Sequence, residues 1–253
     1  METYLVGGKM KEIDINCDMG EGIGNEEAIM PYISSCNVAC GGHAGDVHTM
    51  RKTVELALQH GVAIGAHPSY PDRAHFGRRV MDITDSELKQ SIKEQLTLFQ
   101  EVLNEAGASL QHIKPHGALY NEIARNSDLA HCFLDAIEGY QYIPLYVPYA
   151  SKIQEIAASR GFVTVLEAFA DRNYNPDGTL VSRKEEKALI EAPEEVLDHV
   201  VFMVQNEQVQ TLSKEIIEMK AATYCVHGDT PSALEILVYL HQELSKHNIQ
   251  IKK

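Results

Sequence analysis

The sequence predicts an α/β protein built as a parallel (β/α) barrel with seven strands. Short apolar runs alternate with longer amphipathic stretches along the 253 residues, which is the pattern of parallel βαβ units. No Pro-, Gly- or Ser-rich linker interrupts this alternation, so we expect one domain over residues 10–253. Polar residues follow nearly every predicted strand, as they do in a barrel whose strands all open on one face. An open doubly wound sheet would concentrate them near one switch point.

Seven short segments have the composition of buried strands. The first is I-D-I at residues 13–15, and the last, at residues 222–226, ends directly before a histidine. The predicted strands cover residues 13–15, 36–40, 62–66, 110–114, 142–147, 162–166 and 222–226.

Amphipathic segments between these strands predict helices. The clearest covers residues 85–106, because Thr84 and Glu87 have the spacing of a capping box and Gly107 provides a stop. Residues 207–221 fit either a hairpin or a helix. The other predicted helices cover residues 46–60, 118–138, 150–160, 193–206 and 231–246.

The charge balance and the cysteines narrow the functional class. The 22 Lys and Arg against 36 Asp and Glu give a formal net charge of −14, which argues against binding to nucleic acid or to an anionic membrane. The sequence shows neither a membrane-spanning apolar run nor a secretion signal, and its five cysteines form no C-x-x-C pair. We therefore expect a cytoplasmic protein. Residues 1–9 have no periodicity and are interpreted as an N-terminal extension.

The first polar cluster follows the first predicted strand, in D-I-N-C-D-M-G-E. Asp18 and Glu21 could hold a hard metal ion or transfer protons, and Asn16 lies beside them; a solvated turn is the alternative. The glycines that follow do not complete a dinucleotide fingerprint, because Asn25 replaces the third glycine. There is also no G-x-x-x-x-G-K-[ST] sequence, so a self-contained ATP site is not visible.

The second and third clusters contain histidines. N-V-A-C-G-G-H-A-G-D includes Asn37 and His43, and its glycines allow close approach of a ligand. His43 is a candidate base or metal ligand, whereas Cys40 fits packing better than nucleophilic chemistry. G-A-H-P-S-Y-P-D contains His67 in a sequence that a rigid loop also explains. Arg78 and Arg79 follow in F-G-R-R, and they suit an anionic ligand or a surface ion pair.

The remaining clusters follow the last strands. In K-P-H-G-A-L-Y, Lys114 ends an apolar strand where burial is expected to lower its pKa, and His116 is a proton carrier. Glu167 begins a long loop that could act as a lid. No H-E-x-x-H or zinc-ribbon spacing is present, so metal binding is left open. The metal-ligand candidates are Asp18, His43, His67 and His116.

Together, seven ordered motifs from Met10 to about Ile249 resemble the LamB/YcsF family, whose bacterial members form the A subunit of 5-oxoprolinase. The motifs are D-I-N-C-D-M-G-E, N-V-A-C-G-G-H-A-G-D, G-A-H-P-S-Y-P-D, F-G-R-R, K-P-H-G-A-L-Y, E-A-F-A-D-R-x-Y and C-V-H-G-D-T-P. The resemblance implies a barrel of the glycoside hydrolase/deacetylase type. It also implies ATP-dependent hydrolysis of 5-oxo-L-proline to L-glutamate, with Mg²⁺ accompanying ATP and 5-oxoprolinase subunits B and C as partners.

The resemblance places the reaction at the mouth of the barrel. Arg78 or Arg79 would hold the substrate carboxylate, Lys114 would stabilise negative charge, and the acids and histidines would transfer protons or hold a metal. The implied catalytic set is Asp18, Glu21, His43, His67, Lys114, His116, Glu167, His227 and Asp229. The implied substrate-binding set is Asn16, Asn37, Arg78, Arg79, Tyr120 and Arg172. The alternatives are a stand-alone metal-dependent amide or carbohydrate deacetylase and a non-catalytic ligand-binding subunit.

Overall fold

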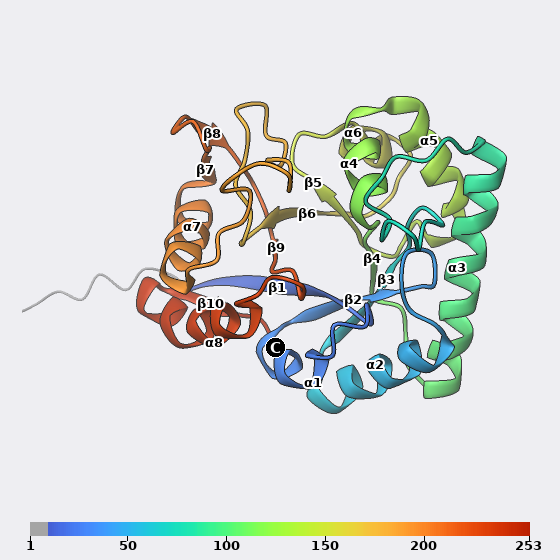
Figure 1. The fold of residues 1–253 in the computed structure, drawn as a ribbon, viewed down its shortest axis with the longest axis horizontal. Helices are drawn as coiled ribbons and strands as arrows, with labels where there is room; N and C mark the ends of the chain where they lie inside the picture. Colours follow the sequence, from blue (N-terminus) through green and yellow to red (C-terminus); the bar gives the residue numbers. More distant parts are fainter. Residues whose placement is uncertain (1–9) are drawn as a thin grey trace, which may run out of the picture.

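Seven parallel strands form a closed barrel in the computed structural model, which describes residues 10–253. The predicted extension at residues 1–9 lies outside the described residues. The strands pair in the order β1-β2-β3-β4-β5-β6-β9, and β9 pairs with β1 to close the ring (Figure 1). They are β1 (Lys11–Met19), β2 (Ser35–Ala39), β3 (Ala63–His67), β4 (His112–Ile113), β5 (Leu145–Pro148), β6 (Thr164–Phe169) and β9 (Thr223–Cys225). The predicted barrel and its seven strands are confirmed.

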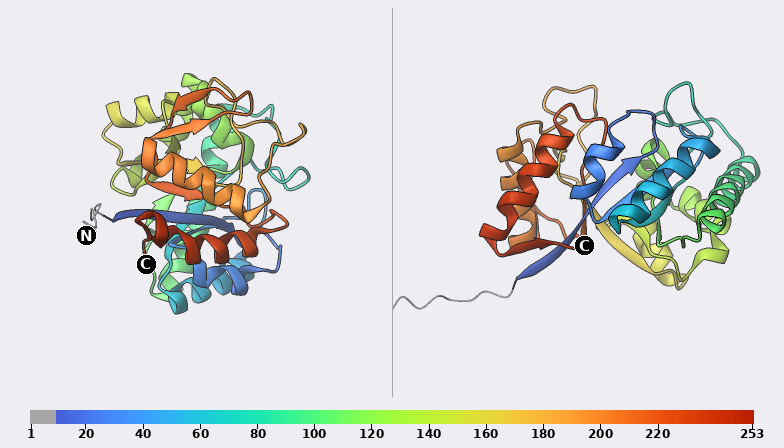
Figure 2. Two further views of the ribbon diagram at one scale, coloured as in Figure 1. Left: turned by 90° about the vertical axis from the view of Figure 1, so that its left-hand side faces the viewer. Right: turned by 90° about the horizontal axis from the view of Figure 1, so that it is seen from below.

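Three further strands lie outside the ring. Residues 207–221 form a hairpin rather than a helix, with β7 (Gln208–Gln210) antiparallel to β8 (Ile216–Glu218). The short strand β10 (Ile249–Ile251) was not predicted. It pairs with the beginning of β1, so the C-terminal end of the chain lies beside that strand (Figure 2).

Most of the predicted helices are present, and they surround the barrel (Figure 1). Helix α3 begins at Thr84 with the predicted capping box and ends at Gly107, which has a φ of 66°. Helices α7 and α8 lie side by side on one flank (Figure 2). The helices that match single predicted segments are α2 (Val47–His60), α3 (Asp85–Ala106), α6 (Lys152–Ser159), α7 (Pro193–Asn206) and α8 (Ala233–Glu243), and a 3₁₀ turn (Leu244–His247) follows α8.

The single helix predicted over residues 118–138 is instead two helices, α4 (Gly117–Arg125) and α5 (Ser127–Ala136). Asn126 separates them because its backbone is extended, with φ −106° and ψ 110°, and its side chain accepts the amide N–H of Leu129. That bond caps the start of α5. The unpredicted short helix α1 (Glu26–Ile29) and 3₁₀ turns at Met30–Tyr32 and Glu138–Tyr140 complete the described helices.

Strand β1 shows how the barrel separates its apolar and polar layers. Ile13, Ile15 and Cys17 belong to the apolar core, whereas Asn16 and Asp18 bond to side chains of other strands across the barrel. This alternation follows from the two-residue period of a strand. Among residues 10–253, no helix combines the length and the apolar composition that crossing a membrane requires.

Candidate functional site

A cavity of about 880 Å³ opens at the carboxyl ends of the barrel strands. Many residues predicted from the sequence contribute to its wall, although they come from every part of the chain. The predicted site residues that line it are Asp18, His67, Arg78, Arg79, Lys114, His116, Tyr120, Glu167, Arg172 and His227. The barrel therefore brings the motifs to one face, as the strand-end pattern predicts.

The floor of the cavity is an ion cluster centred on Lys114, whose side chain is only 2% exposed. Its ammonium lies 3.1 Å from Asp18 Oδ1 and 2.9 Å from Glu167 Oε1. It also donates to Asn16 Oδ1 and contacts Cys225 Sγ, each at 3.1 Å. A buried ammonium between two buried carboxylates is held in one position by these contacts.

The electrostatics of this cluster correct one prediction. Burial by itself would lower the pKa of Lys114, as the sequence suggested, but Asp18, Cys225 and Glu167 raise that pKa well above its usual value. For Asp18, burial would raise the pKa, and the charges of His67 and Lys114 lower it well below its usual range. Lys114 is therefore a fixed cation and not a base poised near neutral pH.

The two asparagines predicted to bind substrate are used inside this cluster. Asn37 donates to Asn16 Oδ1 and to Asp18 Oδ1, both at 2.8 Å, and accepts from His112 Nε2 at 2.7 Å. Asn16 donates to Glu167 Oε1 at 2.9 Å. Both side chains are fully buried. These contacts orient the charged groups of the cluster, and the role of both asparagines in binding substrate stays a prediction.

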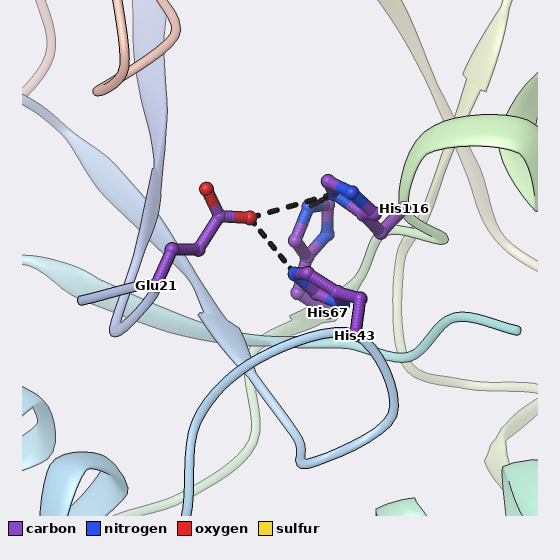
Figure 3. Close-up of side chains that lie close together, drawn as sticks. All are labelled: Glu21, His43, His67 and His116. Atoms are coloured by element: carbon purple, nitrogen blue, oxygen red, sulfur yellow. Dashed lines mark hydrogen bonds and ion pairs between the residues drawn. The ribbon is translucent and has the colours of Figure 1, made fainter. Parts of the chain in front are cut away.

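A second cluster, here called the histidine cluster, consists of Glu21, His43, His67 and His116, which point toward one another (Figure 3). They come from the ends of four neighbouring strands, β1 to β4. Glu21 Oε1 lies 2.9 Å from His43 Nε2 and 3.5 Å from His116 Nδ1. His116 Nδ1 lies 2.9 Å from His67 Nε2.

The imidazoles of the histidine cluster are packed against each other. The rings of His43 and His116 stack with centroids 3.7 Å apart. Burial lowers the pKa of His116 well below its usual value, and burial also lowers the pKa of His43. The ligand atoms of the whole cluster lie within 4.8 Å of one another, so it could hold a metal ion.

Two residues after β9, His227 pairs with Asp171, which was not among the predicted site residues. His227 Nδ1 lies 2.9 Å from Asp171 Oδ1, and the same carboxylate accepts from the His227 amide and from Thr230. Asp171 is fully buried. Its position four residues after Glu167, in E-A-F-A-D-R-x-Y, was the only sequence signal. The carboxylate directs the Nδ1 proton of His227 and leaves Nε2 free for proton transfer.

Asp229 and the three predicted arginines (Arg78, Arg79 and Arg172) differ from one another in their contacts and in their exposure. Asp229 was predicted to be catalytic, but it forms an ion pair with Arg78 at 2.5 Å and with Arg183 at 3.2 Å. Arg172 is buried and donates to the carbonyls of residues 181 and 188, so it holds the loop after β6. Arg79 is exposed at the rim of the cavity. Of the three predicted arginines, Arg79 has the geometry that best suits an incoming anion.

Two polar atoms on the cavity wall lack partners within residues 10–253. The Tyr120 hydroxyl and Glu167 Oε2 are buried and form no hydrogen bond. Burial raises the pKa of Tyr120 well above its usual value, and the charge of Glu167 adds to this effect. Buried polar atoms are normally hydrogen-bonded, and the Tyr120 hydroxyl interacts with the Glu167 carboxylate, so a ligand that reached these atoms would take the place of that interaction.

The family model described as the LamB/YcsF family matches residues 13–253. The chain belongs to the LamB/YcsF family. It is 44% identical to a Thermococcus sibiricus protein and 42% identical to a Pyrococcus furiosus protein, each over 95% of this chain and 96% of the relative. A Bacillus cereus relative is 43% identical over 96% of this chain and 98% of its own length. All three relatives are named as the A subunit of 5-oxoprolinase.

A solved structure of another relative has the same fold. The crystal structure of the lactam utilization protein from Thermus thermophilus aligns with a TM-score of 0.88 and 33% identity, covering 95% of this LamB/YcsF chain and 99% of that protein. The fold is thus shared over 95% of this chain. The names of these relatives associate the family with lactam chemistry, and the word "subunit" in three of them indicates a complex of several chains.

Proposed function

We propose that this chain is the lactam-binding subunit of an ATP-dependent 5-oxoprolinase that converts 5-oxo-L-proline to L-glutamate with partner subunits B and C. The observation that supports this most strongly is the nearly full-length similarity to three chains named as the A subunit of 5-oxoprolinase. The polar cavity agrees with it, because a small lactam with one carboxylate needs both an anion-binding group and partners for its amide.

The chemistry explains why ATP is required. Net opening of a five-membered lactam is unfavourable, so the carbonyl oxygen first takes the γ-phosphoryl group of ATP and ADP leaves. Water then adds to the carbonyl carbon, the C–N bond breaks, and the nitrogen takes a proton to become the amine. The acyl phosphate that remains is hydrolysed by a second water molecule to glutamate and phosphate. This chain has no phosphate-loop sequence, which fits ATP binding that depends on the partner subunits.

The cavity supplies groups for each part of the substrate. Arg79 at the rim suits the carboxylate, and the unpartnered Glu167 Oε2 suits the lactam N–H. The Lys114 ammonium is fixed nearby and would stabilise charge that develops on oxygen. His227, held by Asp171, would take the proton of the attacking water and return it to the leaving nitrogen.

The reducing environment of the cytoplasm suits this chain. All five cysteines are free thiols, and all are buried. Burial raises the pKa of Cys36 and of Cys40 to about 12, so neither thiol is a nucleophile at neutral pH.

The test is glutamate release from 5-oxoproline, with and without ATP, by this chain alone and mixed with candidate subunits B and C. We expect activity only in the complete mixture with ATP. His227→Gln should lower kcat by about 10²–10⁴-fold, and Arg79→Gln should mainly raise KM. Arg51→Gln is the control, because Arg51 forms an exposed surface pair with Glu105.

Two other outcomes would redirect the assignment. Amide or acetyl hydrolysis by the chain alone, without ATP and sensitive to chelators, would support the metal-dependent deacetylase that the histidine cluster also suits. Full activity of the assembled mixture with either cavity variant would instead identify a subunit that binds ligand without taking part in catalysis.

A further inference from the structure

We propose that the histidine cluster is a binding site for a divalent transition-metal ion of the zinc class, with His43 Nε2, His67 Nε2, His116 Nδ1 and one oxygen of Glu21 as ligands. The inference rests on the hydrogen bonds that surround the cluster, and it is independent of the reaction proposed above. Figure 3 shows the four side chains converging on one point.

The outer nitrogens of two histidines determine where their protons lie. His116 Nε2 is 2.9 Å from the carbonyl oxygen of Phe76, and His67 Nδ1 is 2.7 Å from the carbonyl oxygen of Lys114. A carbonyl oxygen only accepts, so both of these nitrogens carry hydrogen. In the neutral rings the inner nitrogens, His116 Nδ1 and His67 Nε2, are then bare lone pairs, and they face each other at 2.9 Å.

The third histidine is fixed through a serine. Ser69 Oγ donates its hydrogen to the carbonyl oxygen of Tyr70 at 2.9 Å, so it accepts from His43 Nδ1 at 3.0 Å. His43 Nε2 is therefore also bare, yet it lies 2.9 Å from a carboxylate oxygen of Glu21, which only accepts. Gln95 bonds to both the amide and the carbonyl of Ser69 and holds it in place.

Three nitrogen lone pairs and a carboxylate oxygen thus face one another with no hydrogen between them. With the three rings neutral this arrangement is repulsive, and either added protons or a metal ion at the centre relieves it; one metal ion satisfies all four groups at once. Metal-ligating histidines almost always donate their other ring N–H to a carbonyl or similar acceptor, as these three do. Three of the spacings, 2.9 to 3.5 Å, are near the roughly 3.3 Å edge of a tetrahedron whose metal–ligand bonds are about 2.0–2.1 Å. The rings of His43 and His116 are stacked, so one of them would turn on binding to bring both lone pairs to the ion.

Two of the four side chains border the cavity. His67 and His116 line it, whereas Glu21 and His43 do not. A bound ion would therefore have room for a water molecule or a substrate oxygen as a further ligand, as catalytic zinc does when it becomes five-coordinate. The carboxylate of Asp18, 3.4 Å from His67 Nε2, would offset part of its charge.

A second group of potential ligands, Asp18, Cys225 and His227, is a poorer site. The ammonium of Lys114 lies 3.1 Å from both Asp18 Oδ1 and Cys225 Sγ. A fixed cation already occupies the position where a metal would need to approach these two atoms. The two groups predict different spectra, because only the second contains sulfur.

The test is metal binding by the isolated full chain, which does not depend on catalytic activity. The chain is stripped with a chelator, titrated with Co²⁺ or Zn²⁺, and passed through gel filtration before elemental analysis. We expect about one ion per chain, Co²⁺ absorption typical of nitrogen and oxygen ligands, and a thermal midpoint that rises with the ion. His43→Gln and His116→Gln should weaken binding at least about 100-fold.

Two controls make the result decisive. His75→Asn should bind normally, because His75 is half-exposed and pairs with Asp72 outside the cluster. Cys225→Ser should also bind normally. Failure of the chain to retain any of the ions, or unchanged binding in both cluster variants, would overturn the proposal. A sulfur-to-cobalt band that disappears in Cys225→Ser would overturn it in favour of the second group. The glutamate assay is separate, so either hypothesis can fail alone.

Discussion

Replacing Lys114 with Met should strongly destabilise the fold in a pH-dependent manner. The ammonium lies 2.9 to 3.1 Å from Glu167 and Asp18. At an effective dielectric constant of about 20, charges that far apart attract by about 5–6 kcal/mol per pair. Dehydration of the three groups offsets much of this. Removal of one partner from a buried ion pair typically costs about 3–5 kcal/mol, because the remaining charge is left uncompensated.

The pH dependence has a defined sign. In the native chain the pKa of Asp18 lies below its unfolded value, so its stabilising effect is constant between pH 7.5 and 5. Without the ammonium, the pKa of Asp18 rises, because burial disfavours its charge and Lys114 no longer offsets that effect beside His67. The variant then takes up a proton on folding at lower pH. The difference in free energy of unfolding between the native chain and Lys114→Met should therefore shrink as the pH falls, by up to about 1.4 kcal/mol per pH unit.

Urea denaturation followed by circular dichroism at pH 7.5, 6 and 5 measures this difference directly. Lys220→Met is the matched control, because Lys220 pairs with Glu218 on the surface and both side chains are about half exposed. Its cost should stay below about 1 kcal/mol. A deficit for Lys114→Met below about 1 kcal/mol, or one that does not change with pH, would refute the account of the ion cluster.

Three further stability predictions follow from the packing and can be measured by the same denaturation assay. Gly65→Ala should cost about 3 kcal/mol or more, because its Cβ would lie 2.1 Å from His112 Nε2; Gly139→Ala, which faces open space, should be nearly neutral, and equal effects would contradict the packing. Burial lowers the pKa of His112 from 6.5 to about 3, so protonation of the unfolded chain should remove about 2 kcal/mol of stability between pH 7.5 and 5. His112→Gln, which can still donate to Asn37, should lose less over that range, and an identical loss would exclude His112 as the cause. Thr84→Ala should cost about 1 kcal/mol by removing the side-chain cap of α3. Thr84→Ser keeps the hydroxyl and should cost less; an equal loss in both variants would show that the hydroxyl does not stabilise the helix start.

The sequence predicted the barrel because each strand is an apolar run bounded by turn residues. It did not predict the break at Asn126, since the apolar spacing of Ile123, Ala130 and Phe133 continues across it. The residue type alone was the signal, because Asn followed by Ser and Asp is typical of a helix start. Strand β10 was missed because three residues, I-Q-I, are too few to show a period.

The sequence was sufficient to predict which residues lie at the site, but not which side chains contact each other there. Residues that follow parallel strands must share one end of the barrel, so the histidines and acids could be named from the sequence. Contacts such as those of His227 with Asp171 and of His43 with Ser69 join distant residues, and they depend on side-chain directions that no local spacing encodes. The sequence therefore identified reacting groups more readily than the groups that orient them.

Burying the polar and charged side chains in the interior of this barrel costs free energy, and that cost supports a functional role for them. Barrel interiors are commonly filled by branched apolar side chains, whereas here Asn16, Asn37 and Lys114 occupy the layer below the cavity. Apolar replacements of buried ions are often neutral or stabilising, so stability alone does not explain this layer. Asp18 connects it to the histidine cluster, because its Oδ1 lies 3.1 Å from Lys114 Nζ and 3.4 Å from His67 Nε2. A cation bound by the histidines would therefore draw on the same carboxylate that positions the ammonium, so that the two charged groups act on the cavity together.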